Sequence, residues 1–549
     1  MRCGTPRRAA WRSAASCTIT RPRAARSWTP ACRAFSPTAW RRAPEAGRMP
    51  HRLREAALLV GSAVVLALAF PRTDWEMAAW FALVPLLLVA LETAPRIAFA
   101  WGWLYGLTFF LVLLRWLDFT FRTYSEIPWP LTWGVVFLLS AWCGLYVAAV
   151  AGLVSLIARR GSPAWALATA PCLWVGAEWL RGHFLGGFPW GTLGYSQYLR
   201  LTVIQVAELG GVHAVSFVLV AVNAALAGAL VLSWRRALGG VALAVALVGA
   251  VLAFGVVRLR ATPPPAEAQI AIMQPAIEQP LKWDPDHATV VLKIYLELTR
   301  QAGATQPDLI VWPETASPTP LRRDAGLLET LTGLSRQLRA ALLIGSIDVL
   351  DGAPTRFSNA AFLVTERGIV GRYDKIHLVP FGEYVPLSGV IGFVRGWAEF
   401  IAELEPGARA VVFPGPPAPF GIVICYEGIF PDLFREFVNN GARVMVNMTN
   451  DGWFGRTSGP AQHLTMYPFR AVEHRIAIVR AANTGVSAFI APSGQIVRHL
   501  GLFQRGVLSD RVPLRRGRTL FTRLGDWVAW SSLALAAASV GVASRRPAC

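Results

Sequence analysis

Charged residues are scarce in this sequence. Asp, Glu, Lys and Arg make up 16% of its 549 residues, whereas hydrophobic residues make up 54% and the mean hydropathy is +0.42. A typical soluble domain carries about 25% charged residues. The composition therefore excludes an ordinary soluble protein, although the length is sufficient for about two to four domains.

Acidic residues are nearly absent from residues 1–48, which hold eleven Arg and one Glu. This short segment supplies +10 of the net charge of +20. The rest of the chain shows no basic patch with interleaved aromatic residues, so we expect no nucleic-acid partner. Residues 1–48 also lack the apolar core of a signal peptide. We expect translation to start at Met49 and residues 1–48 to be a non-native or disordered extension.

Cysteine and histidine are few and unclustered. The seven cysteines form no CxxC pair, and the eight histidines form no HExxH motif. The spacing predicts neither a zinc site nor a disulfide framework, and we expect no metal and no other cofactor. Cys143 and Cys172 lie in apolar runs and are expected to be core residues. Only the neighbours of Cys425 can show whether that thiol is different.

Long apolar runs are what the sequence has in abundance. Eight are long enough, or nearly so, to span a bilayer: residues 55–70, 77–92, 97–116, 131–157, 165–180, 203–233, 238–258 and 525–544. Arginines fall in alternate connections, so the positive-inside rule places both chain ends in the cytoplasm. We predict a membrane α-helical bundle of about eight transmembrane helices, with helices one to seven in residues 49–260 and the eighth at 524–544.

Residues 266–515 show a different pattern. After the proline-rich stretch TPPP (262–265), short β-like runs alternate with helix-like runs, which predicts one extracytoplasmic α/β domain between the seventh and eighth helices. Strands are expected at 268–277, 308–314, 341–347, 358–364, 421–427 and 442–450, and helices at 287–303, 324–340 and 461–480.

Three reactive side chains lie at or near strand ends in this domain. Glu314 follows the apolar run of DLIVWPE, Lys375 lies in GRYDKIHLVPFGEYVP, and Cys425 ends the run GIVIC. A thiol is a strong nucleophile only as the thiolate. A carboxylate can accept the thiol proton, and an ammonium can stabilise the oxyanion of an acyl-transfer intermediate. The three residue types are therefore sufficient for thioester chemistry.

The motifs WPE, DKxHLVPFGEYVP and CYE, in this order, resemble the Glu-Lys-Cys triad of the nitrilase superfamily. Together with the expected membrane helices, they make the chain from about Met49 similar to the apolipoprotein N-acyltransferase family. The stretches QPAIEQPLKWDP, NMTNDGWFG, RAANTGVSAFI and FPWGTLGYSQ fit the same family. The resemblance implies a nitrilase-like αββα sandwich for the catalytic domain, residues 266–515.

The resemblance also implies a reaction and a location. The family transfers an acyl chain from a phospholipid, typically phosphatidylethanolamine, through a cysteine thioester to the N-terminal amine of a diacylated apolipoprotein. This is the last step of lipoprotein maturation. We accordingly expect a multi-pass, monomeric protein of the bacterial inner membrane whose catalytic domain faces the periplasm.

Carried over to the matching positions, the resemblance makes Glu314 the general base and Lys375 the cation that stabilises the oxyanion. Cys425 becomes the nucleophile that accepts the acyl chain. Glu383, in the stretch GEYVP, is expected to hold the lysine and help shape the site.

Four further residues match supporting positions of the family. Tyr426 and Glu427 flank the nucleophile and are expected to be needed for activity. Trp283 matches a tryptophan on a mobile arm that controls access to the pocket, and Asn359 matches a supporting polar group.

Three other functions are open. A membrane-tethered amidase or hydrolase of the nitrilase type would pass the thioester to water, but one anchor helix would suffice for it. A transporter with a sensory domain would carry ionisable residues within its helices, whereas here they lie mostly at helix ends. A Cys-His hydrolase using His377 is compatible with the composition, but Lys375 fits better.

The start site is directly testable. N-terminal sequencing of the native protein is expected to give a chain that begins at or near Met49. A mature chain that begins well before Met49 would contradict this expectation.

Overall fold

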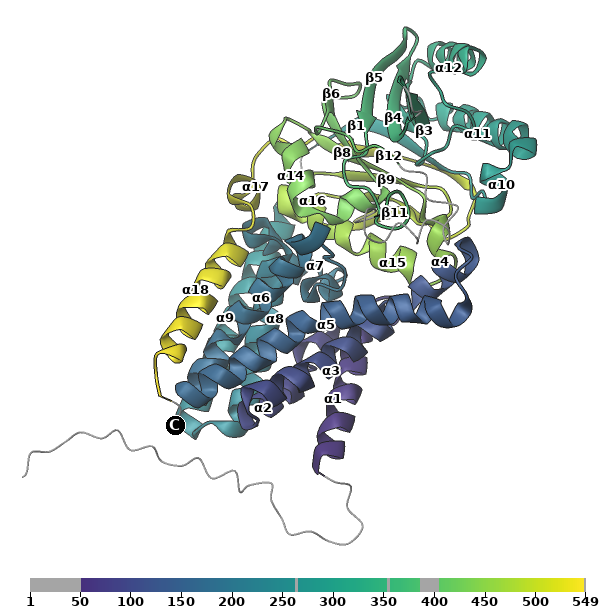
Figure 1. The fold of residues 1–549 in the computed structure, drawn as a ribbon. Coiled ribbons are helices and arrows are strands. Elements are labelled where there is room, and N and C mark those ends of the chain that lie inside the picture. Colours follow the sequence, from purple (N-terminus) through teal and green to yellow (C-terminus); the bar gives the residue numbers. More distant parts are fainter. Residues whose placement is uncertain (1–50, 262–264, 353–355, 386–403, 548–549) are drawn as a thin grey trace, which may run out of the picture. The chain divides into compact units, whose positions relative to one another are not determined.

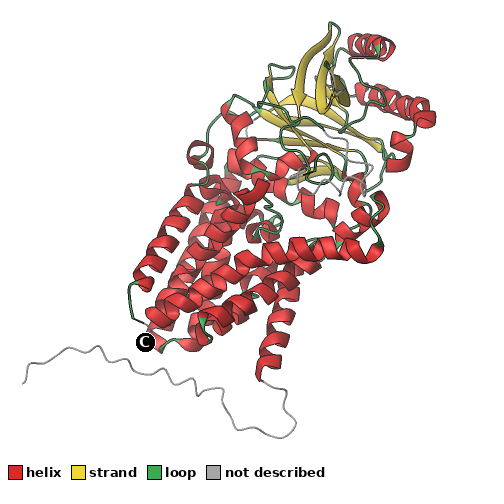
Figure 2. Cartoon of the chain, viewed as in Figure 1, coloured by secondary structure: helices red, strands yellow, loops and turns green. Residues whose placement is uncertain are grey.

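The computed structural model describes residues 51–261, 265–352, 356–385 and 404–547 of the chain, so the expected extension 1–48 lies outside it. The first part of the described chain is helical (Figures 1 and 2). Its helices are α1 (His51–Ala67), α2 (Val84–Glu92), α3 (Pro95–Leu113), α4 (Trp116–Tyr124), α5 (Trp129–Arg160), α6 (Pro163–His183), α7 (Leu201–Ile204), α8 (Ala207–Val231) and α9 (Trp234–Arg260), and α17 (Leu520–Leu524) and α18 (Trp527–Ser544) follow near the other end.

Five of the described helices, α3, α5, α8, α9 and α18, are long and apolar enough to cross a membrane. The other three expected spans coincide with α1, α2 and α6. Helix α1 has 17 residues and α2 has nine, while α6 has 21 residues but carries Glu178 and Arg181 near its end. A helix needs about 20 apolar residues to span the hydrocarbon core. The sequence therefore located all eight helices, and five of them have the properties of a span.

Small residues allow α3 and α5 to pack closely. A Cβ atom placed on Gly106 would lie 2.7 Å from the Cα atom of Gly144. Small residues at such crossings let helix backbones approach within membranes, where packing replaces the hydrophobic effect as the driving force.

The second part of the chain contains two six-stranded sheets (Figure 1). The first has the strand order β12-β1-β2-β3-β4-β5 and the second β11-β10-β9-β8-β7-β6. The strands are β1 (Ala266–Gln274), β2 (Leu309–Val311), β3 (Ala341–Leu350), β4 (Arg356–Thr365), β5 (Gly368–Asp374), β6 (Val412–Phe413), β7 (Phe420–Ile424), β8 (Val444–Thr449), β9 (Ile478–Ala482), β10 (Ser487–Ile490), β11 (Ile496–Leu500) and β12 (Gly506–Pro513).

Alternating apolar residues place these sheets face to face with helices outside. In β1, Ala271 and Met273 belong to a core shared with α11 (Ala288–Gly303) and α12 (Ala325–Leu338). Ile270 and Ile272 point to the opposite face and belong to the core that holds the second sheet. Helices α14 (Pro431–Asn439) and α16 (Met466–His474) pack on the outer face of the second sheet. The period of two along β1 thus produces a helix–sheet–sheet–helix sandwich.

Each of the six expected strands overlaps an observed one, whereas the expected helix 461–480 is correct only in part. It consists of α15 (Gly459–Leu464) and α16, which ends at His474, and residues 478–482 form β9. Arg475 adopts a left-handed conformation, with φ +49°, that stops the helix. All five residues of β9 are buried, and a continuous apolar run does not distinguish a buried strand from a buried helix.

Gln462 joins the helical part to the part of the chain that contains the two sheets. Its side-chain oxygen accepts hydrogen bonds from the indole N–H groups of Trp116 (3.0 Å) and Trp190 (2.8 Å), and its amide donates to the backbone oxygens of Pro71 and Leu113. Trp190, in the stretch FPWG, is therefore a buried structural residue. Trp129, in EIPWP, is 60% exposed and has the exposure expected of an interfacial anchor.

Gly345 of β3 provides a test of how the fold positions the end of β2. A Cβ atom on Gly345 would overlap the carbonyl oxygen of Pro313 and lie 2.7 Å from the backbone nitrogen of Thr315 and 2.9 Å from the Cα atom of Glu314. Because these are backbone atoms, Gly345→Ala is expected to lower the free energy of unfolding by about 1–3 kcal/mol. The midpoint of thermal unfolding of the purified protein should fall accordingly.

Gly333→Ala is the matched control. Gly333 lies in α12 with no atom within 4 Å of its added Cβ, so the substitution should raise the free energy of unfolding by about 0.5–1 kcal/mol. Equal unfolding midpoints for Gly345→Ala and the wild type would contradict the proposed close packing.

Candidate active site

A buried lysine forms the centre of the site. The ammonium of Lys375 lies 3.2 Å from Oε1 of Glu314 and 2.8 Å from Oε1 of Glu383, and the lysine is 1% exposed. The side-chain amide of Asn359 donates to the same two oxygens, at 2.8 Å to Glu314 and 3.1 Å to Glu383. Four residues expected from the sequence therefore meet in one hydrogen-bonded cluster.

Three strands of the first sheet place these side chains together. Glu314 follows β2, Asn359 lies within β4, and Lys375 comes directly after β5. The backbone N–H of Lys375 donates to the carbonyl of Asn359 at 2.8 Å, which continues the β4–β5 pairing by one residue. Glu383 fixes its own loop because its Oε2 accepts a hydrogen bond from the backbone N–H of Val379. The neighbouring strands thus align the cluster at one edge of the sheet.

The charges of Glu314 and Lys375 stabilise each other. Burial alone would raise the pKa of Glu314, but the ammonium groups of Lys375 and Lys282 outweigh burial and hold the pKa of this carboxyl below its usual range. Burial likewise disfavours the charged form of Lys375, while Glu314 and Glu383 raise its pKa well above its ordinary value. At neutral pH the site therefore holds an ionised carboxylate beside a protonated lysine.

Cys425 occupies a strained position at the end of β7. It opens the short turn Cys425–Ile429 with a φ angle of +52°, a conformation that residues other than glycine rarely adopt. Burial raises the pKa of the Cys425 thiol, and the Glu314 charge adds to that effect, whereas the Lys375 charge opposes it. The resting thiol is protonated, so the reactive thiolate requires a base.

Glu427 connects the end of β7, which precedes Cys425, to the segment that follows Lys375. Its Oε1 accepts hydrogen bonds from the phenol of Tyr373 (2.7 Å) and from the backbone N–H groups of Ile376 (2.5 Å) and His377 (3.2 Å). Its Oε2 accepts one from the N–H of Ile424 (2.6 Å), the residue before Cys425. Burial raises the pKa of Glu427 to about 7. This carboxyl is a structural brace between the two segments rather than part of the charged cluster.

Tyr426 and His377 both pack against the ring of Phe430. The Phe430 centroid lies 5.1 Å from that of Tyr426 and 4.4 Å from that of His377. Burial lowers the pKa of His377. The structure thus places the imidazole in an aromatic stack, which does not favour the Cys-His hydrolase alternative.

Trp283 ends the short helix α10 (Gln279–Trp283) and is 45% exposed. The residue before it, Lys282, was not anticipated as a site residue. Lys282 is buried and donates to the carbonyl oxygen of Glu314 (3.0 Å) and to the hydroxyl of Thr315 (2.6 Å). Burial lowers the pKa of Lys282 to about 8, although the charges of Glu314 and Cys425 oppose this shift. Lys282 lies in the stretch QPAIEQPLKWDP, which matches the family, and this was the feature of the sequence that could have identified it.

Asn450 is a second residue that sequence reasoning did not single out. Its backbone N–H donates to Oε2 of Glu314 at 2.8 Å, so both oxygens of this carboxylate are held. The Asn450 side chain donates to Gln279 of α10 and accepts from Asn483. The stretch NMTNDGWFG contained this residue, but a backbone contact carries no sequence signal.

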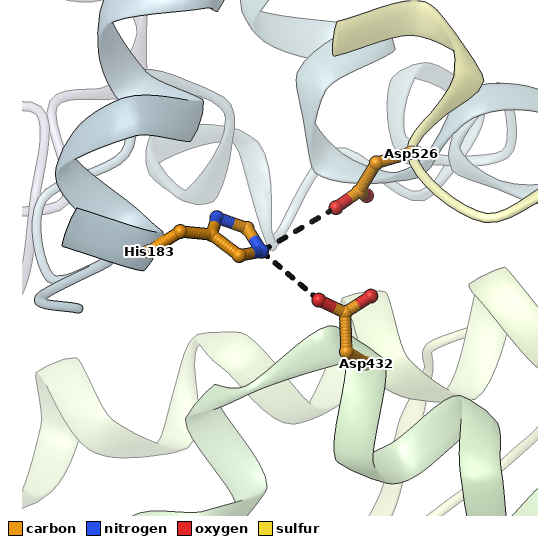
Figure 3. A group of neighbouring side chains, drawn as sticks. All are labelled: His183, Asp432 and Asp526. Atoms are coloured by element: carbon orange, nitrogen blue, oxygen red, sulfur yellow. Dashed lines mark hydrogen bonds and ion pairs between the residues drawn. The ribbon is translucent and has the colours of Figure 1, made fainter. Parts of the chain in front are cut away.

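A group of possible metal ligands lies apart from this cluster. Donor atoms of His183, Asp432 and Asp526 all lie within 4.8 Å of one another (Figure 3). Nε2 of His183 is 2.9 Å from Asp432 and 3.9 Å from Asp526, and its Nδ1 is 2.8 Å from the carbonyl of Trp179. A protonated imidazole satisfies these contacts by itself, so the geometry does not require an ion.

The arrangement is suited to covalent acyl chemistry. A buried thiol, an ionised carboxylate and a paired ammonium act on one another, and the two sheets with outer helices hold them. This combination defines a carbon–nitrogen hydrolase domain of the nitrilase type. A carbon-nitrogen hydrolase family model matches residues 269–520, and a model of the apolipoprotein N-acyltransferase N-terminal domain matches residues 62–225.

Curated relatives identify the family more narrowly. An apolipoprotein N-acyltransferase from Geobacter metallireducens is 39% identical over 513 residues, 92% of this chain and 98% of that protein. The protein of the same name from Vibrio cholerae is 31% identical and covers 89% and 97%. A mutant amidase from Nesterenkonia has a TM-score of 0.36 and 20% identity, covering 48% of this chain and 99% of its own. The chain belongs to the apolipoprotein N-acyltransferase family.

Lys282→Met tests the second lysine. Removing one of the two cations that hold down the pKa of Glu314 should raise that pKa, so the acid limb of the pH–rate profile should move to higher pH. The inflection near pH 8, where Lys282 loses its charge, should disappear. The measurement is the rate of acyl transfer between pH 5 and pH 10.

Lys293→Met serves as its control because Lys293 is an exposed lysine of α11. Lys293→Met should leave both the acid and the alkaline limb of the pH–rate profile unchanged. A Lys282→Met profile that superimposes on the wild type would show that Lys282 does not act on the cluster.

Proposed function

We propose that the protein is an apolipoprotein N-acyltransferase that moves an acyl chain from a phospholipid to the N-terminal α-amine of a diacylated apolipoprotein. The observation that carries the proposal is the buried Lys375, paired with Glu314 and Glu383 beside the protonated thiol of Cys425. Full-length similarity to proteins of this name supports it.

In the first half-reaction, Sγ of Cys425 attacks the sn-1 ester carbonyl while Glu314 accepts the thiol proton. Lys375 stabilises the oxyanion, and backbone N–H groups at the start of the turn after β7 add to this stabilisation. The ester C–O bond then breaks, and Glu314 returns the proton to the departing lysophospholipid hydroxyl. The acyl chain remains on Cys425 as a thioester.

In the second half-reaction, the α-amine of the apolipoprotein attacks the thioester. Glu314 accepts a proton from the amine, the C–S bond breaks, and the thiolate of Cys425 regains a proton from Glu314. The products are an amide and the original enzyme. Asn359 and Glu383 keep Lys375 in place, and Glu427 keeps Cys425 in register with the lysine segment. The exposed Trp283 at the end of α10 controls access to the pocket, as the family resemblance implies.

A membrane location follows from the energetics of the donor. Removing a sixteen-carbon chain from the bilayer costs about 13 kcal/mol at ~0.8 kcal/mol per CH₂. We therefore place the catalytic domain, residues 266–515, at the membrane surface on the periplasmic side of the inner membrane. The eight helices of residues 49–260 and 524–544 then all contribute to the bundle of a monomer, with phosphatidylethanolamine as the donor.

The thioester is the test of the proposed function. Purified protein incubated with phospholipid should carry a hydroxylamine-sensitive acyl group on Cys425, detected by mass spectrometry of the intact protein and its peptides. Cys425→Ser should lack this thioester and lose transfer by at least about 10³-fold, because the nucleophile and base act as a unit.

Cys172→Ser, which changes a buried cysteine of α6, should acylate and transfer normally. Undiminished transfer by Cys425→Ser, or acylation of a different residue, would refute the assignment. Release of free fatty acid in place of an N-acylated lipopeptide would favour the tethered hydrolase.

A further inference from the structure

A second buried polar network lies against the turn that carries Cys425. Its members Asp451, His463 and Tyr467 are each at most 1% exposed. Oδ1 of Asp451 lies 2.9 Å from Nδ1 of His463, and Nε2 of His463 lies 3.2 Å from the hydroxyl of Tyr467. The same hydroxyl donates to the backbone carbonyl of Cys425 at 3.2 Å. The network therefore ends on the backbone of the nucleophile, and the two half-reactions leave it without a role.

Arg480 fixes the other end of this network. Its Nη2 donates to Oδ2 of Asp451 at 2.6 Å, and its guanidinium carbon lies 4.7 Å from the centroid of the Tyr467 ring. Burial alone would raise the pKa of Asp451, but the Arg480 guanidinium and the contact with His463 outweigh burial and lower that pKa to about 2. Asp451 is therefore an ionised carboxylate, which can only accept hydrogen bonds.

The hydroxyl of Tyr467 has one proton and two acceptors within reach. Because the Asp451 carboxylate only accepts, Nδ1 of His463 carries the proton of the contact between them. Burial lowers the pKa of His463, and the charge of Arg480 adds to that effect, so the imidazole is neutral and its Nε2 is an acceptor. This nitrogen and the carbonyl of Cys425 both lie 3.2 Å from the hydroxyl. The phenol can therefore give its proton to the carbonyl without moving.

The turn after β7 has room for this hydroxyl only because of a glycine. A Cβ atom placed on Gly428 would overlap the hydroxyl of Tyr467. The hydrogen bond reaches the carbonyl of a residue whose φ angle is +52°. Such a conformation costs about 1–3 kcal/mol and persists only where the surrounding structure holds it. Tyr467 is thus part of what holds Cys425 in its strained conformation.

The carbonyl of Cys425 and the N–H of Tyr426 belong to one peptide unit. This unit is planar and trans, so the two groups point in opposite directions, and a hydrogen bond to the carbonyl sets the direction of the N–H. An amide whose N–H donates to a developing negative charge is polarised, which makes its carbonyl a stronger acceptor. A donor at the carbonyl therefore binds more strongly in the transition state than in the resting enzyme, which is the condition for raising a rate.

We infer that Tyr467 is a positioning residue for acyl transfer. Its hydroxyl, held in place by His463 and Asp451, fixes the peptide between Cys425 and Tyr426 so that the Tyr426 N–H meets the oxyanion together with Lys375. Tyr467 acts on this peptide and touches neither the thiol nor the lipid. The inference rests on the proposed function and adds to it the group that orients the backbone donor.

The test compares two reactions of the same thiol in full-length Tyr467→Phe. Thioester formation from phosphatidylethanolamine vesicles passes through an oxyanion, whereas alkylation by iodoacetamide displaces iodide from a saturated carbon and forms no tetrahedral oxyanion. Tyr467→Phe should slow thioester formation about five- to tenfold with KM for the lipid unchanged, which is the loss of one hydrogen bond in the transition state. The rate of Cys425 alkylation should stay at the wild-type value. Mass spectrometry of the intact protein measures both.

Tyr295→Phe is the matched control. It removes the same atom from a buried tyrosine of α11 whose hydroxyl has no hydrogen-bond partner in the described part of the chain. Both rates should equal those of wild type. If Tyr467→Phe fails to fold, 3-fluorotyrosine in place of Tyr467 keeps the shape of the side chain and makes the phenol a stronger donor. That substitution should raise the rate of thioester formation and leave alkylation unchanged.

The results distinguish this inference from the function on which it rests. Wild-type thioester formation by Tyr467→Phe, or by the fluorinated protein if only that one folds, would overturn the inference alone. An equal loss of alkylation and thioester formation would also overturn it, because Tyr467 would then act on the thiol or on the fold. A wild-type protein that is alkylated at Cys425 but forms no thioester with any phospholipid would refute the proposed function itself.

Discussion

The ammonium of Lys375 is buried between the carboxylates of Glu314 and Glu383, and the geometry of the site depends on this pairing. A buried charge is tolerated only where opposite charges and hydrogen bonds surround it, and removing one partner leaves the others uncompensated. Asn359 donates to both carboxylates, and the backbone of Asn450 holds the remaining oxygen of Glu314. The cluster therefore fixes the ends of three strands of the first sheet together with the loop that bears Glu383.

The second constraint positions Cys425 relative to this cluster. Cys425 belongs to the other sheet, so its position relative to Lys375 depends on how the two sheets pack. Glu427 fixes that relation because its carboxyl bonds both to the residue before Cys425 and to the segment after Lys375. The carboxylate nearest to the thiol in sequence is thus a brace, while Glu314, more than a hundred residues earlier, is the ionised carboxylate that we propose as the base.

Contacts between the helical part and the catalytic domain are specific hydrogen bonds as well as apolar packing. Gln462 accepts from two tryptophans of the helical part, and the buried pair Arg470 and Glu473 bonds to Tyr195 and to the backbone of Val212. Several polar atoms at this boundary have no hydrogen-bond partner, including atoms of Glu178 and His213.

Local apolar periodicity was sufficient to locate the helical segments and six of the strands, and motifs that end strands on reactive side chains identified Glu314 and Lys375. Asn359 and Glu383 were expected only from the family resemblance. The expected helix 461–480 ran into residues 478–480 of strand β9, because a fully buried apolar run has the same pattern in a helix and in a strand. The contacts of Lys282 and Asn450 became visible only in the tertiary structure. Lys282 donates to the backbone carbonyl of Glu314, and Asn450 donates its backbone N–H to the Glu314 carboxylate. The apolar periodicity of a segment predicts which of its faces is buried. Contacts between segments that are distant in the sequence arise only when the sheets and helices pack together.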